Sequence, residues 1–201
     1  FAPFAVKIKE ECFERWKQLR FAYCPQLKDI GQSGFCYCQQ LQVIIGDKIQ
    51  SIKSQAFYCC FNLTLINLQN VKNFGKDSFY STGLMSIANI AAIKLNYVVF
   101  SSSDSLQQIE FQNIKEIKSQ TEFSQAQMLT SVRFPNLQQK QWDNLSVSKQ
   151  KIVHISHDTH EIWEQKYQRI NFQKFEHIFT PQLPKSELIN KLKQVDYIFD
   201  K

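Results

Sequence analysis

The sequence has little glycine and proline, and it has no long apolar run and no long like-charged run. Glycine and proline number five each among 201 residues, which excludes collagen-like chains and flexible linkers. The best apolar stretch, 86–100, is interrupted by Asn89, Lys94 and Asn96, so we expect no membrane insertion in this segment. No like-charge run exceeds three residues, so we expect neither nucleic-acid binding nor a polybasic membrane anchor.

Motifs that carry chemistry are also scarce. The six cysteines include no CxxC pair, which removes zinc ribbons and thioredoxin-type sites. No nucleophile–base pair, phosphate loop or paired carboxylates stand out, so we expect neither catalysis nor a cofactor. His154, His157 and His160 lie beside Asp158 and Glu161, a set that could bind a transition metal. Their spacing matches no known helical or finger motif, and we interpret them as exposed or capping histidines that hold no metal.

The start of the chain carries no visible leader. The first residues, FAPFAVKIKEE, contain neither a basic start nor a long apolar region, and there is no initiator methionine. We expect the chain to be a piece of a longer protein. The segment itself therefore indicates neither a compartment nor an oligomeric state.

Phenylalanine is the abundant residue type, with 17 copies. With 43% hydrophobic residues, the chain has enough apolar material for one domain, with or without an appendage. The net charge of +6 and the pI near 8.9 are mildly basic. This composition excludes a disordered chain and leaves binding and scaffold proteins as the classes to weigh.

Six of these phenylalanines recur at a nearly constant interval. They stand at Phe13, Phe35, Phe57, Phe79, Phe100 and Phe123. The interval is 22 residues, except for steps of 21 and 23 that a one-residue deletion near Thr82 and a one-residue insertion near Gln120 explain. Aliphatic residues recur at fixed distances from these phenylalanines, in what we call columns of the repeat. The unit is LxxIxxxxΦxxIxxxxFxxxxx(L), where Φ is any aliphatic residue. Such agreement across six units indicates an internal repeat.

A 22-residue unit of this kind predicts a solenoid. One coil would bury four or five apolar side chains, each contributing about 1.5–3 kcal/mol, whereas ordering its 22 residues costs about 1.5 kcal/mol apiece. Coils are therefore stable only when stacked, because stacking buries both flanks of each interior coil. The short apolar part, as in 63–68, predicts a strand. Stacking then gives a parallel sheet and an interior phenylalanine column, with six coils spanning roughly 25 Å at about 4.8 Å per coil.

The units resemble the BspA-like, or Treponema-type, leucine-rich repeat, whose pattern is roughly LxxIxLPxxLxxIgxxAFxxCxxL. Its Ala-Phe-x-x-Cys-x-x-Leu core is met in full at Ala56, Phe57, Cys60 and Leu63. The core is nearly met from Gly34 to Leu41, and Pro135 matches the proline after the strand. The resemblance covers about residues 5–142. Departures at the cysteine column are Trp16, Ser103 and Ala126, and the proline is missing from the other coils.

This resemblance implies a fold and a class of function. The fold is a leucine-rich-repeat solenoid of about six coils, with a parallel β-sheet on one side and irregular segments on the other. The implied function is non-enzymatic recognition of a macromolecule, a protein or an extracellular-matrix ligand, or attachment at a cell surface. An intracellular structural or scaffold repeat protein is the alternative.

The cysteines fit structural columns of the repeat. Cys38 and Cys60 occupy the cysteine column one coil apart, and Cys12 precedes Phe13 in the small-residue column. We interpret them as buried reduced thiols that act as small hydrophobes. A disulfide between stacked coils is the alternative, but parallel side chains rarely meet its dihedral requirement.

Alternation along the strand predicts an outward face. If Ile44 and Gly46 point inward, their neighbours point outward. The candidate binding residues are Val43, Ile45, Leu65, Asn67, Gln108, Glu110 and Arg133, with Ser86, Ala88 and Ser131 in equivalent positions. The face is apolar in its N-terminal half and polar in its C-terminal half, and an exposed apolar strip on a sheet suggests a partner. Packing against a neighbouring segment is the alternative.

Lysines recur beside the aliphatic columns and could form a basic stripe along the coil edge. They are Lys9, Lys53 and Lys118 in one column and Lys28, Lys72 and Lys115 in another. Asp29, Asp47, Asp77 and Glu116 are interleaved with them in the sequence. We therefore interpret the edge as a mixed, solvated surface, since stacked like charges would repel.

The period fades after residue 142, and residues 146–201 are expected to form a helical C-terminal cap or an appended segment. Asp158 and Glu161 read as a capping box that opens a helix. Ser186 precedes a final amphipathic pattern. A solenoid needs a terminal cap over its open core, and this segment is the candidate.

Overall fold

The computed structural model describes residues 2–119, 123, 125–138 and 140–141. From Pro3 onward, these residues belong to one compact unit. The expected C-terminal helices of residues 146–201 and the histidines His154, His157 and His160 lie outside the described residues.

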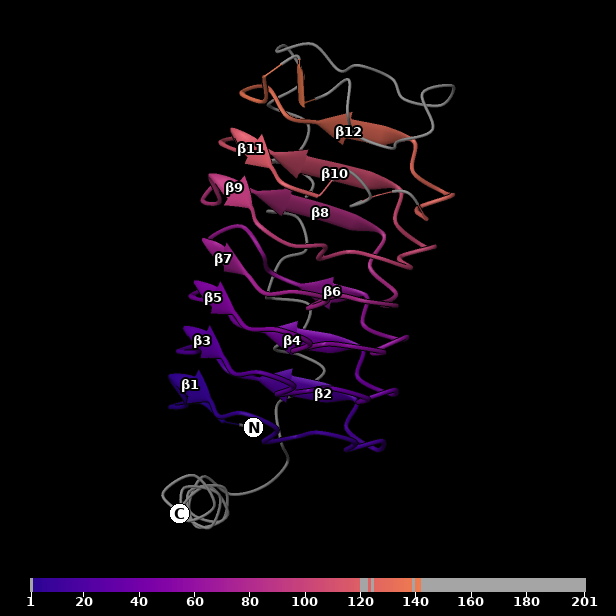
Figure 1. Ribbon diagram of the computed structural model, residues 1–201. Coiled ribbons are helices and arrows are strands. Elements are labelled where there is room, and N and C mark those ends of the chain that lie inside the picture. The colour runs from indigo at the N-terminus through magenta and orange to yellow at the C-terminus, as the bar shows by residue number, and fades with distance from the viewer. Residues whose placement is uncertain (1, 120–122, 124, 139, 142–201) are drawn as a thin grey trace, which may run out of the picture. The chain divides into compact units, whose positions relative to one another are not determined.

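Each coil contributes two short strands joined by tight turns (Figure 1). The first strand of each coil is β1 (Lys7–Ile8), β3 (Asp29–Ile30), β5 (Ser51–Ile52), β7 (Asn73–Phe74), β9 (Lys94–Leu95) or β11 (Glu116–Ile117). The second is β2 (Phe21–Tyr23), β4 (Val43–Ile45), β6 (Leu65–Ile66), β8 (Ser86–Asn89), β10 (Gln108–Phe111) or β12 (Ser131–Arg133). Between the two strands of each coil lies one repeat phenylalanine, and we number coils 1–6 in chain order by these phenylalanines.

All the strand pairs are parallel, and their register follows the repeat. Ile44 pairs with Ala22 on one side and with Ile66 on the other, which are one period away in each direction. The predicted parallel solenoid of about six coils is confirmed. The predicted single sheet is too simple, because the first strands form their own sheets, β1-β3-β5-β7 and β9-β11, beside β2-β4-β6 and β8-β10-β12. The columns of Ile30 and Ile52 are therefore strands.

Both rows of strands are interrupted at the same place in the chain. The ladders end at β6 and β7 and resume at β8 and β9. The one-residue deletion near Thr82 lies within this interval of the chain. The buried side chain of Asn89 bridges the interruption, since its Nδ2 donates to the carbonyls of Leu68 and Val71 at 2.7 and 2.8 Å. Its Oδ1 accepts from the amides of Ala91 and Ala92 at 3.1 and 2.8 Å. The amide thus uses its full hydrogen-bonding capacity where the strand ladders are interrupted.

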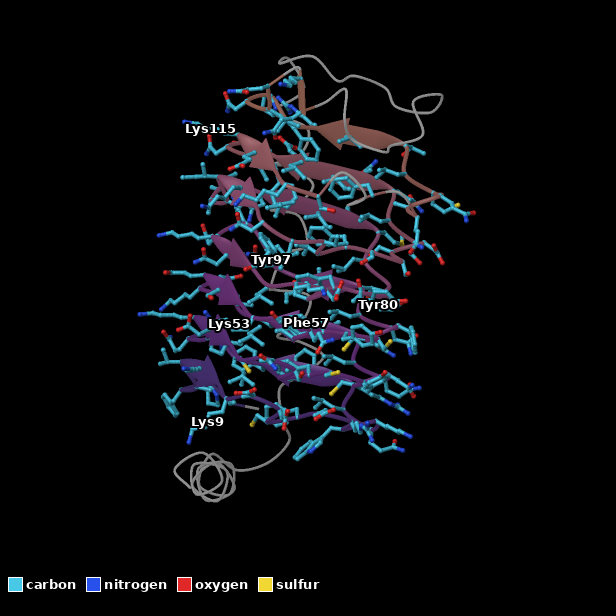
Figure 2. The ribbon with its side chains drawn as sticks, in the orientation of Figure 1. Lys9, Lys53, Phe57, Tyr80, Tyr97 and Lys115 are labelled. Carbon is cyan, nitrogen blue, oxygen red and sulfur yellow. The ribbon has the colours of Figure 1, made fainter. Side chains whose placement is uncertain are left out.

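The repeat phenylalanines form an interior stack, as predicted. Ring centroids of successive coils are 5.2, 5.4, 5.2, 5.5 and 6.3 Å apart, with interplanar angles of 5–24°. Figure 2 shows Phe57 within the body of the stack, and its side chain is fully buried. The widest spacing is between Phe100 and Phe123, across the insertion near residue 120. A second group of rings, Phe74, Phe111 and Phe134, packs against this stack.

The turn around each phenylalanine is built from residues in the left-handed region. The positions two before the phenylalanine have φ near 55° in coils 1–4: Glu11, Ser33, Gln55 and Asp77. The positions two after the phenylalanine also have positive φ, between 50° and 61°, in coils 1–5: Arg15, Tyr37, Cys59, Ser81 and Ser102. Alternate amides then donate to the next coil, as Phe35 does to the Ala56 carbonyl at 2.8 Å. The side of the coils that carries these turns, which we call the turn side, is therefore hydrogen-bonded from coil to coil, although its described residues form no strand.

Candidate binding face

The outward side chains of the second strands lie in straight ladders, which we call the strand face. Phe21, Val43 and Leu65 are direct partners in successive strands, and so are Ser86, Gln108 and Ser131. The inward neighbours Ile44 and Ile109 are each only 2% exposed, which fixes the orientation of the alternation. The strand face therefore exists in the predicted register.

The N-terminal half of the strand face is apolar and partly exposed. Phe21, Val43 and Leu65 are half-buried, and Tyr23 and Asn67 flank them with similar exposure. Asn67 is held in place, because its Nδ2 donates to Asp47 Oδ1 at 3.1 Å and its Oδ1 accepts from the Gln69 amide at 3.0 Å. Ile45, in contrast, is only 8% exposed, so it adds little contact area.

The C-terminal half of the strand face differs from the expectation of an open polar surface. Glu110 and Arg133 are direct partners in β10 and β12, and both are buried, at 5% and 7% exposed. Arg133 Nη1 lies 3.3 Å from Glu110 Oε1, and Gln112 donates to the same carboxylate oxygen at 3.3 Å. Opposite charges in direct register attract each other, so these two side chains tie the strands together and are not available to a ligand.

Sequence reasoning missed Phe21 and Tyr23, which begin the two ladders. Coil 1 has Trp16 where the family core has its cysteine, so its strand is harder to align from the pattern. The signal that finds them is the 22-residue offset from Val43 and Ile45. With them, the apolar ladder has three members.

A second row of rings lies on the turn side. Tyr58 and Tyr80 are stacked with centroids 4.5 Å apart, and Tyr37 packs against Tyr58 at 5.6 Å. The guanidinium of Arg15 lies 5.7 Å from the Tyr37 ring centre, a cation–π distance. The row is not visible as one column of the repeat, because Tyr37 follows its phenylalanine by two residues and the other tyrosines follow theirs by one.

All six cysteines are free thiols. Cys38 and Cys60 are buried, as expected from their column, whereas Cys12 is half-buried. Cys38 Sγ donates to the Phe13 carbonyl at 2.9 Å, and Cys60 Sγ donates to the Phe35 carbonyl at 3.0 Å. Ser103 occupies the same column and donates to the Phe79 carbonyl at 3.4 Å. In these three coils the column therefore supplies a small donor that reaches the previous coil, a role beyond that of a small hydrophobe.

Burial also shifts the acidity of these thiols. It raises the pKa of Cys36 and Cys38 to about 11, and it raises the pKa of Cys60 as well. The Glu14 carboxylate adds to the effect at Cys36. Neutral thiols are poor nucleophiles, so these side chains serve packing and hydrogen bonding.

Neither a metal-binding cluster nor a membrane-spanning helix occurs among the described residues. They contain no group of three or more His, Cys, Asp or Glu placed to hold a metal ion. Across the same residues, no helix has the length and hydropathy of a membrane span.

These features define a class of protein, a parallel β-solenoid built from leucine-rich repeats. The family model for the BspA type leucine rich repeat region matches residues 5–96 and 89–171, with six copies. The chain belongs to this family. Leucine-rich repeats are in general binding modules and typically not enzymes.

The comparison with solved structures finds a leucine-rich repeat protein of T. pallidum, determined by crystallography. It is 18% identical to this chain and covers 72% of it, and the match spans 78% of the T. pallidum chain with a TM-score of 0.48. A search of the curated proteins finds no match.

Proposed function

We propose that this chain is a non-enzymatic recognition module that binds another protein through the N-terminal half of its strand face. The observation that carries the proposal is the ladder of Phe21, Val43 and Leu65, which is apolar, partly exposed and in direct register. Apolar rows on an open sheet face are typical of binding surfaces. The cell-surface attachment implied by the family resemblance would use the same face, with an extracellular-matrix protein as the ligand.

The geometry favours a partner that lies across the coils. The three side chains project from strands about 4.8 Å apart, and the central strand, β4, pairs with β2 on one side and with β6 on the other. A surface held this rigidly loses little conformational entropy on binding, which favours affinity. Tyr23 and Asn67 supply polar atoms at the border of the row, as at the rim of a protein interface.

Binding to a panel of immobilised matrix proteins (fibronectin, laminin and collagen), measured by surface plasmon resonance, tests the proposal. The variant with Val43→Glu and Leu65→Glu places two charges in the ladder, and we expect it to weaken binding by about tenfold or more, equivalent to about 1.4 kcal/mol. The control variant carries Phe61→Glu and Met85→Glu, which change the same charge at side chains that are 51% and 49% exposed. An equal loss in both variants, or no binding by the unmodified chain, would contradict the proposal.

A further inference from the structure

Among the described residues, eight of the twelve exposed lysines lie along the outer edge of the first strands. We call the segments 6–9, 28–31, 50–53, 72–75, 93–96 and 115–118 the lysine strip; each is a first strand with one residue on either side. These 24 residues hold eight lysines, no arginine, and two carboxylates, Asp29 and Glu116. Eight minus two gives +6, which equals the net charge of the whole chain. The remaining 177 residues therefore sum to zero.

Two of the four acidic residues that interleave with the strip in the sequence lie outside it in the structure. Asp47 accepts from Asn67 at the strand face, and Asp77 accepts from Ser101 on the turn side, so both lie outside the strip. Glu10 and Lys76 each follow a segment of the strip directly in the sequence, and their opposite charges sum to zero. Asp29 and Glu116 remain within the strip, but both are half-buried, whereas all eight lysines are exposed.

Every coil contributes at least one lysine to the strip. They are Lys7 and Lys9 in coil 1, Lys28 in coil 2, Lys53 in coil 3, Lys72 in coil 4, Lys94 in coil 5, and Lys115 and Lys118 in coil 6. Figure 2 shows Lys9, Lys53 and Lys115 along one edge of the stack, opposite Tyr80. With coils about 4.8 Å apart, the row extends over roughly 24 Å.

Glycines separate lysines that would otherwise stack directly. The column after the first strand reads Lys9, Gly31, Lys53, Gly75 through coils 1–4, and its backbone hydrogen bonds run from coil to coil. A Cβ on Gly31 would lie 2.7 Å from the Lys9 carbonyl carbon, and one on Gly75 would collide with the backbone of Lys53. Only glycine fits, so lysines in this column stand about 9.6 Å apart. The spacing lowers their repulsion while the row stays continuous.

We propose that the lysine strip binds a sulfated linear polysaccharide that runs along the stacking axis. A narrow row of cations, one or more per coil, matches a narrow polymer that carries negative charge on successive sugar units. Lysine acts as a point charge toward such groups, whereas planar recognition of phosphate is typical of arginine. The one aromatic ring in the strip, Phe74, is 6% exposed, so the strip offers no stacking platform for nucleic-acid bases.

The strip and the strand face are different surfaces, so the two proposals fail independently. A defect in the lysine strip leaves Phe21, Val43 and Leu65 unchanged. Matrix-protein binding and polysaccharide binding therefore report on separate residues of the same chain.

The test is fluorescence anisotropy of a labelled heparin-derived oligosaccharide with the full chain at about 50 and 200 mM salt. The strip variant carries Lys28→Gln, Lys53→Gln and Lys72→Gln, three exposed side chains from successive coils. The control variant carries Lys17→Gln, Arg20→Gln and Lys140→Gln, which remove the same charge from exposed positions outside the strip. We expect the strip variant to bind about tenfold or more weakly with a smaller dependence on salt, and the control to change by less than about threefold.

Three results would overturn the proposal. One is an equal loss in both variants, which would mean that only net charge matters. Another is the absence of salt-dependent binding by the unmodified chain. The third is equal or tighter binding of single-stranded DNA or of phosphatidylserine vesicles. Thermal melting verifies that the variants fold, and Lys53→Glu alone, which reverses one exposed charge at the centre of the row, repeats the test with a single change.

Discussion

At the scale of single residues, the phenylalanine column stabilises the stack by burying each ring against the rings of neighbouring coils. Phe57 is fully buried and stacks on Phe35 and Phe79 at 5.4 and 5.2 Å. We expect Phe57→Ala to lower the free energy of unfolding by about 3–5 kcal/mol, because both ring contacts are lost and a cavity remains. Urea denaturation measures this. The control is Phe61→Ala, at a side chain that is 51% exposed, with an expected cost below about 1 kcal/mol. Similar values for the two variants would mean that the ring stack is not a major source of stability.

The buried thiols make stability depend on pH. The ordinary pKa of these thiols is 9.0, and burial raises the pKa of Cys36 and Cys38 to about 11 in the folded chain. Between these values the folded state holds more protons than the unfolded state, so the free energy of unfolding falls as pH rises. The contribution is fully present below pH 9 and is lost as pH rises through about 11.

Urea denaturation at a series of pH values measures this loss. The double variant with Cys36→Ser and Cys38→Ser lacks the two titrations, so we expect its stability to fall less over that window than that of the unmodified chain. The same slope in both proteins would assign the loss to lysine or tyrosine ionisation.

At the scale of elements, Asn89 replaces strand pairing at the interruption. It is 1% exposed and bonds to Leu68, Val71, Ala91 and Ala92. We expect Asn89→Ala to cost about 2 kcal/mol or more, because buried carbonyls and amides lose their partners. Thermal or urea unfolding measures the loss. Asn113→Ala is the control, since Asn113 is exposed and donates to the Ile90 carbonyl at 2.7 Å; we expect its cost to stay within about 0.5 kcal/mol. Equal costs would show that the bridge adds nothing beyond a surface hydrogen bond.

The strands and turns could be predicted to different extents. The second strands were predictable because their apolar pattern, as in 63–68, is of the strand type. The first strands were not recognised, because each is only two residues long and its single aliphatic residue also fits an irregular segment. The left-handed turn positions gave no signal at all, since Gln55 and Cys59 occupy them where glycine or asparagine would mark such a conformation.

At the scale of the molecule, the interruption between β6–β7 and β8–β9 divides the stack into two blocks. Phe100 lies at their junction, where it contacts Phe79 and Phe74 of the first block at 5.5 and 5.9 Å. Solenoid stability is a sum of nearest-neighbour interfaces, so a weakened junction lets the blocks unfold separately. We expect Phe100→Ala to split or broaden the urea transition and to lower the apparent m-value.

Phe35→Ala is the matched control for this junction. Phe35 and Phe100 are each 1% exposed, so the same volume is removed, but Phe35 lies inside the first block. We expect its variant to keep a single transition at a lower midpoint. Hydrogen exchange resolved along the chain checks which coils open together, and one joint opening in both variants would contradict the two-block description.

The candidate surfaces could be predicted only in part. Alternation placed Val43 and Leu65 on the outward face correctly, because the two-residue period of a strand is local geometry. It did not reveal that Glu110 and Arg133 pair and are buried, since that depends on which strands become neighbours. The lysines were visible in the sequence as well, but the acids near them in sequence are not all near them in space. Asp47 and Asp77 turn toward other sides of the coil.

By itself, the sequence determined the repeat length, the number of coils and the identity of the interior column. These follow from a 22-residue period and from the need of each coil to bury its apolar side against another. Only the tertiary structure decided where the ladders break, how Asn89 closes that gap, and which charges share an edge. The repeat period determines which residues of neighbouring coils stack on each other. The direction of each exposed side chain and the effect of a missing residue depend on how the backbone of the whole coil closes.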